Sequence, residues 1–123
     1  MAWKVTVTPD KDTAAKGEKA FDDELVFADE KVTATACVVR GFKPSVYSVT
    51  GAGDVLKWST IQRSEAEGLS NWIGQVKDGT MTGKLIWVKR DGTRLVYTFT
   101  SEPPAESLPK PAEPPKKEDD RTR

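Results

Sequence analysis

Apolar and polar residues alternate along most of the first 100 positions of the chain. The pattern is clear from the start, where Trp3, Val5 and Val7 alternate with lysine and threonine. A period of two residues is typical of a β-strand with one buried face. The same pattern predicts eight strands, at residues 3–8, 24–27, 31–39, 45–50, 54–62, 69–77, 80–89 and 93–100.

Turn signals between these segments indicate how the strands are connected. Asp78-Gly79 and Asp91-Gly92 each separate two alternating runs, and Asp-Gly favours the type I′ hairpin turn, in which both central residues have positive φ. A polar turn at residues 28–30 predicts a further hairpin. Evenly spaced strands joined by sequential hairpins favour an up-and-down barrel. We therefore predict an all-β fold, a small antiparallel eight-stranded barrel over residues 1–100.

The phase of the strands selects the side chains that face the interior. Gly74 and Gly83 lie within strands, which predicts strand coiling or the close approach of a large side chain. An eight-stranded barrel either is filled by its own side chains or holds one small ligand, and the many aromatic residues favour a filled interior. The six residues that we expect to line the interior are Trp58, Trp72, Met81, Trp87, Tyr97 and Phe99.

Residues 101–123 differ in composition from the rest of the chain. They contain six of the eight prolines, and Leu108 is their one large apolar residue. Such a segment cannot bury enough surface to offset the entropy of ordering it. We predict a disordered Pro-rich tail, either solvated or used as a ligand by a proline-recognising domain.

Composition excludes several classes of function. The chain has no His and one Cys, so it lacks the ligand sets of zinc, haem and iron–sulfur sites and the common Ser/His and Cys/His catalytic groups. Its 19 basic and 19 acidic residues leave no surplus of positive charge for nucleic acid. The acidic groups at residues 22–24 and 29–30 are interpreted as solvated, and Cys37 as a small buried residue. We predict no enzyme, cofactor or metal site.

Two further features concern the longest connection and the location of the protein. Residues 10–20 join the first two strands, and we interpret them as a solvated loop, with a lid over the barrel end as the alternative. No apolar run approaches the ~20 residues of a membrane span. The chain begins without a basic and apolar leader, which predicts a cytoplasmic protein as written, or an exported one whose signal peptide was removed.

The stretch from Asn71 to Phe99 also carries a resemblance to known proteins. Its elements are Asn71-Trp72-Ile73-Gly74, the two Asp-Gly turns, Met81 to Trp87 with Gly83 between them, and Tyr97-Thr98-Phe99; Lys16-Gly17-Glu18-Lys19 and Phe21-Asp22-Asp23 precede them. In these elements the chain resembles small bacterial lipocalin-like (calycin-type) β-barrel proteins, and more narrowly a group of short bacterial proteins of uncharacterised function. The resemblance covers about residues 2–100 and implies a fold whose cavity often holds apolar small molecules.

These observations support two hypotheses about function. The first is non-catalytic binding of a small hydrophobic or aromatic ligand inside the barrel, with the six interior residues as its contacts. The second is a protein-interaction or inhibitor module with a filled barrel. In that case the tail or the outer wall, where Ile73, Ile86 and Val96 lie on the opposite phase, would contact a protein partner.

Overall fold

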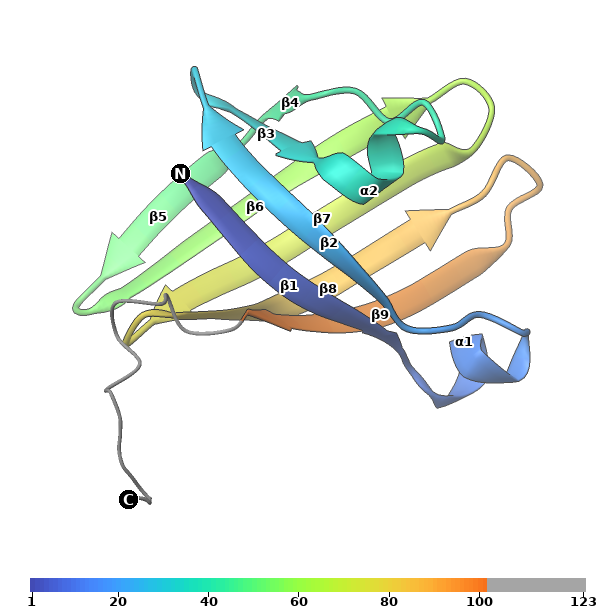
Figure 1. Cartoon of the computed structure of the whole chain (residues 1–123), viewed down its shortest axis with the longest axis horizontal. Coiled ribbons are helices and arrows are strands. Elements are labelled where there is room, and N and C mark those ends of the chain that lie inside the picture. The colour runs from blue at the N-terminus through green and yellow to red at the C-terminus, as the bar shows by residue number, and fades with distance from the viewer. Residues whose placement is uncertain (102–123) are drawn as a thin grey trace.

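The computed structural model, which describes residues 1–101, is a nearly closed antiparallel β-barrel made of one nine-stranded sheet (Figure 1). The order β4-β3-β2-β1-β9-β8-β7-β6-β5 is an up-and-down meander in which the first and last strands meet. The predicted all-β antiparallel architecture is confirmed. The strands are β1 (Ala2–Pro9), β2 (Phe21–Ala28), β3 (Lys31–Ala34), β4 (Ser45–Val46), β5 (Ser48–Ala52), β6 (Val55–Ser64), β7 (Gly68–Lys77), β8 (Thr80–Val88) and β9 (Arg94–Ser101). Beyond Ser101, the predicted tail lies outside the described residues.

The strand count of nine, rather than the predicted eight, results from a break at Tyr47. The segment predicted as one strand begins as β4, paired with β3, and continues as β5, paired with β6. Tyr47 separates the two parts and packs edge-to-face on Phe27, with ring centroids 5.0 Å apart. One short stretch of chain therefore contributes to both edges of the sheet.

Residues 35–39 were predicted as the end of a strand, and this is wrong. The strand β3 ends at Ala34 and is followed by the short helix α2 (Thr35–Val38), which packs against β2 (Figure 1). Ala34, the N-cap residue before this helix, provides no side-chain cap. Instead the Asp23 carboxylate of β2 accepts the backbone N–H of Ala36 at 2.7 Å. A contact between distant residues thus overrides the local strand pattern.

The long connection after β1 is partly helical, and it is held to β9. Helix α1 (Lys11–Ala15) begins after Asp10, whose side chain accepts the N–H of Thr13 at 2.8 Å. Pro9 ends β1. Beyond it, the backbone N–H of Asp10 donates to the carbonyl of Val96 at 2.9 Å, and the Thr13 hydroxyl accepts the N–H of Val96 at 2.8 Å. Thr13 is buried, although most side chains of this connection are exposed. The interpretation of this connection as a solvated loop is therefore wrong for its backbone, which is hydrogen-bonded to β9.

The predicted turns are confirmed in one Asp-Gly pair and wrong in the other. Asp78 and Gly79 have φ of 53° and 77°, as a type I′ turn requires. At the second pair only Gly92 has positive φ. The Asp91 carboxylate accepts the N–H of Thr93 at 2.9 Å, so the chain forms a longer loop between β8 and β9.

The two strand glycines are directly paired and leave room for aromatic rings. Gly74 of β7 lies opposite Gly83 of β8. A Cβ atom on Gly74 would lie 2.5 Å from Nε1 of Trp58, and one on Gly83 would lie 2.6 Å from Cζ of Phe99. The predicted close approach of large side chains is confirmed, and it fills this part of the barrel.

The gap between the two edges of the sheet is bridged by polar side chains of β6. Thr60 and Gln62 face inward and donate to the carbonyl groups of Val46 in β4 and Val32 in β3, at 2.7 and 3.0 Å. Ser64 donates in the same way to the chain that follows α2. These bonds join β6 to β4, β3 and the chain after α2, so the barrel closes here through side chains.

Candidate functional site

A cavity of about 410 Å³ opens at one end of the barrel, next to α2 and the residues that precede β2. Its walls come from β2, β7, β8, β9 and the segment around α2. The aromatic and leucine side chains of the lining are Phe21, Phe42, Leu85, Trp87 and Tyr97. Two aromatic pairs, Phe21 with Tyr97 and Phe42 with Trp87, meet edge-to-face across strands and loops. The site is thus concave and largely apolar, as small-molecule sites are.

All six predicted interior residues are buried, but the structure divides them between the two halves of the barrel. Trp87 and Tyr97 line the cavity. The remaining four do not line it: Trp58, Trp72, Met81 and Phe99.

The half of the barrel away from the cavity is filled. Phe99 packs against Trp72 and Trp58, with ring centroids 5.3 and 6.2 Å apart. Phe27 packs edge-to-face on Trp58 at 5.0 Å. Two of these rings, Trp58 and Phe99, occupy the space above the paired glycines. The two alternatives for the interior, filled or open, therefore each describe one half of this barrel.

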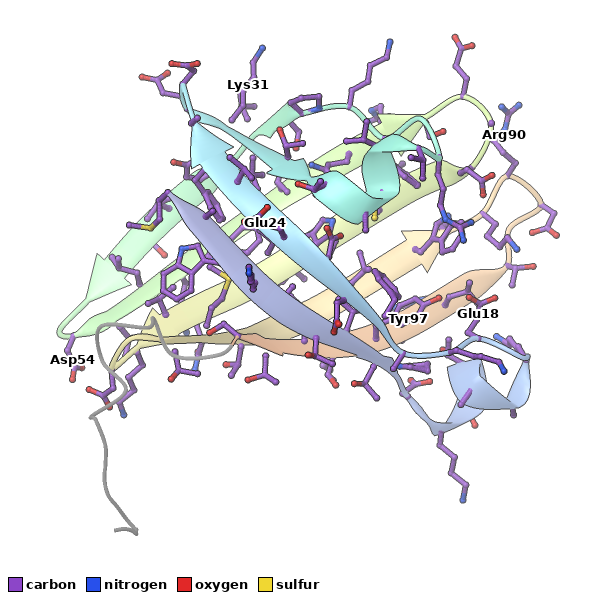
Figure 2. The ribbon with its side chains drawn as sticks, in the orientation of Figure 1. Glu18, Glu24, Lys31, Asp54, Arg90 and Tyr97 are labelled. Atoms are coloured by element: carbon purple, nitrogen blue, oxygen red, sulfur yellow. The ribbon has the colours of Figure 1, made fainter. Side chains whose placement is uncertain are left out.

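Tyr97 provides a polar group inside the cavity. Its hydroxyl donates to Oε1 of Glu18 at 2.9 Å, and the two side chains meet at the end of the barrel beside α1 (Figure 2). Burial raises the pKa of Tyr97 above its ordinary value, and the bond to the Glu18 carboxylate raises it further. The hydroxyl therefore keeps its proton at neutral pH and remains a donor to Glu18.

Trp87 is held in a fixed orientation at the cavity wall. Its indole N–H donates to the carbonyl of Glu67 at 2.7 Å. The guanidinium carbon of Arg40 and the ammonium of Lys89 lie 5.3 and 5.4 Å from the centre of the ring. Such cation–π contacts orient an aromatic ring. Trp87 is thus a preorganised part of the wall.

Asp23 and Cys37 form a buried polar pair at the cavity wall, where Cys37 lines the cavity. One carboxylate oxygen of Asp23 accepts the N–H groups of Glu24 and Ala36, both at 2.7 Å, and the other accepts the thiol of Cys37 at 3.6 Å. Burial raises the pKa of Asp23. Burial, reinforced by the charge of Asp23, raises the pKa of Cys37 to about 12. Cys37 is buried as predicted, whereas the interpretation of residues 22–24 as solvated is wrong for Asp23.

Sequence reasoning missed several residues of the site. Ser70 is 3% exposed and lines the cavity, and within residues 1–101 its hydroxyl has no hydrogen-bond partner. Strand phase could have predicted this position, because Ser70 points inward like Trp72, two residues further along β7. Glu18 and Phe42 come from connections, where no strand phase exists to mark them.

The remaining observations concern metals, membranes and known proteins. Within residues 1–101, no three His, Cys, Asp or Glu side chains come together in a group that could hold a metal ion. Neither helix of this part of the chain is long and apolar enough to cross a membrane. Comparisons with protein-family models, curated proteins and solved structures gave no match.

Proposed function

We propose that this protein binds a small hydrophobic or aromatic ligand, without catalysis, in the open half of a lipocalin-like barrel. The observation that carries the proposal is the aromatic cavity at the barrel end. Its volume of about 410 Å³ falls in the range of roughly 300–1,000 Å³ that ligand pockets occupy. The meander order and the pairing of β1 with β9 are compatible with a lipocalin-like barrel.

The energy of binding would come from burial of apolar ligand surface. A ligand that buries roughly 200 Å² of apolar surface gains about 5 kcal/mol at about 25 cal/mol per Å². The loss of translational and rotational freedom reduces this figure. The fixed orientation of Trp87 limits the further cost of ordering the wall. We therefore expect affinities weaker than micromolar for a simple aromatic probe.

The test is a titration of the full chain with N-phenyl-1-naphthylamine, a neutral dye whose emission rises when it leaves water. We expect saturable binding near one equivalent, and an affinity about tenfold weaker in Trp87→Ala. Val88→Ala is the matched control, because Val88 is the next residue in β8 and is 40% exposed. Trp87→Phe keeps a buried ring and is measured beside Trp87→Ala. Absence of saturation in the unaltered chain would refute the proposal, as would equal affinities in all variants.

A second candidate function is a protein-interaction module that uses the outer wall. The observation in its favour is that Ile61 in β6 and Ile73 in β7 are 51% and 45% exposed, whereas Ile86 and Val96 are half-buried. Neighbouring exposed apolar side chains are typical of contact surfaces. A partner whose binding is lost in Ile61→Lys and Ile73→Lys, and retained in Trp87→Ala, would favour this candidate.

A further inference from the structure

The polar atoms that face the cavity are mainly acceptors of hydrogen bonds. Tyr97 directs its single proton to Glu18, so its oxygen has only lone pairs left to offer. The Glu18 carboxylate is itself acceptor-only when ionised. Ser70 can donate as well as accept, and its buried hydroxyl has no partner within the described residues. All three residues line the cavity.

Apart from Ser70, the buried side-chain donors around the cavity are already used. The indole N–H of Trp87 donates to the carbonyl of Glu67, at 2.7 Å. The thiol of Cys37 donates to the Asp23 carboxylate, at 3.6 Å. A ligand group that can only accept hydrogen bonds therefore finds the Ser70 hydroxyl as its single side-chain donor among these groups.

Charged side chains of both signs lie at the rim of the cavity. Lys19, Asp22 and Arg40 border the cavity and are exposed to solvent. Arg40 is also engaged with Trp87 and lies 3.8 Å from the carboxylate of Glu67. Exposed charges attract a ligand only weakly, because water screens them. Lys19 and Arg40 therefore do not offset the repulsion that the carboxylate of a ligand would meet beside the carboxylate of Glu18.

We infer that the cavity takes an aromatic ligand whose polar head hydrogen-bonds to Glu18 and Ser70 and is a hydroxyl or an ammonium group rather than a carboxylate. An ammonium can donate to both residues, whereas a hydroxyl uses its single proton on Glu18 and accepts from Ser70. This inference rests on the proposed function. A donating head supplies the partner that Ser70 lacks and uses the free lone pairs of Glu18 and Tyr97. The aromatic body then contacts Trp87 and Phe42.

The test compares three probes with one ring system: 1-naphthylmethanol, 1-naphthylmethylammonium and 1-naphthylacetate. The full chain is titrated with each by isothermal calorimetry. We expect the alcohol or the ammonium to bind at least about tenfold more tightly than the acetate. A preference for the ammonium over the alcohol identifies a cationic ligand class, and the reverse order a neutral one.

Two variants connect the preference to the cavity. Ser70→Ala should weaken the tighter probe about fivefold or more, and Glu18→Gln should reduce the discrimination against the acetate. Glu65→Gln, on the exposed β6–β7 loop, is the matched control and should change neither. Equal or tighter binding of the acetate would overturn the inference while the proposed function stands. Binding of N-phenyl-1-naphthylamine without binding of any of the three probes would also overturn it. If that dye fails as well, the proposed function itself falls.

Discussion

Replacing Asp23 by alanine removes the acceptor that holds α2 to β2. In the native protein one carboxylate oxygen of Asp23 accepts two backbone N–H groups, those of Glu24 and Ala36, both at 2.7 Å. Asp23 is 6% exposed, so water does not readily replace the lost acceptor. Asp23→Ala therefore leaves polar groups of the backbone without partners at the base of the cavity wall.

The size of the effect follows from these two bonds. A hydrogen bond to a charged acceptor contributes about 1.5–3 kcal/mol. Removal of the buried charge offsets part of the loss, because burial of a carboxylate is itself unfavourable. We therefore expect Asp23→Ala to lower the free energy of unfolding by about 2–4 kcal/mol. Asp23→Asn keeps an oxygen for both N–H groups and should lie within about 1 kcal/mol of the native protein at neutral pH.

The same pair of variants tests the ionisation of Asp23. Burial raises the pKa of Asp23 in the folded protein above the ordinary value of 3.8. Between that value and the folded-state pKa, the folded protein binds more protons than the unfolded chain, so this group lowers stability as pH rises. Relative to Asp23→Asn, the native protein should lose stability as pH rises through this window and then reach a constant difference.

The assay is urea unfolding followed by tryptophan fluorescence, between about pH 4 and pH 8. A loss in Asp23→Asn as large as that in Asp23→Ala would show that the charge, rather than the acceptor geometry, holds α2. A loss below about 1 kcal/mol in Asp23→Ala would refute the reasoning outright.

Two further predictions concern the packed half and the thiol. Gly83→Ala places a Cβ against the carbonyl oxygen of Ile73 and 2.6 Å from Phe99, and should lower the free energy of unfolding in urea by about 3 kcal/mol. Thr82→Ala, on the exposed face of β8, should lower it by under about 0.5 kcal/mol. Equal losses of stability in the two variants would contradict the packing argument. Because burial raises the pKa of Cys37 to about 12, the folded protein should react with a disulfide reagent at pH 8 far more slowly than the protein in urea; comparable rates would mean that the thiol is accessible.

Local pattern predicts strands well in this chain and fails where a distant contact decides. The alternation of Val32 and Ala34 continues to Ala36, yet α2 forms because Asp23, on another strand, accepts the N–H of Ala36. Nothing within residues 45–50 announces the break at Tyr47, which depends on the position of Phe27 in β2.

The candidate site shows the same limit. Strand phase separates inward from outward side chains, and it places all six predicted residues inside the barrel. It carries no information about height along the barrel axis, which is what separates Trp87 and Tyr97 from Trp72 and Phe99. Glu18 comes from a connection, so only the three-dimensional structure brings it to Tyr97.

The pairing of β1 with β9 has a consequence for how the protein folds. Val5 lies opposite Ser101, so the last strand-to-strand contact joins residues from the two ends of the described chain. The hairpins from β6 to β9 close short loops and form early. Pairing of β1 with β9 instead closes a loop that contains most of the described chain, and it must overcome the entropy of that long loop. During synthesis, β1 therefore emerges long before its partner exists. Until Ser101 has left the ribosome, β1 and β9 are open strand edges, and this interval is when the chain is most exposed to aggregation.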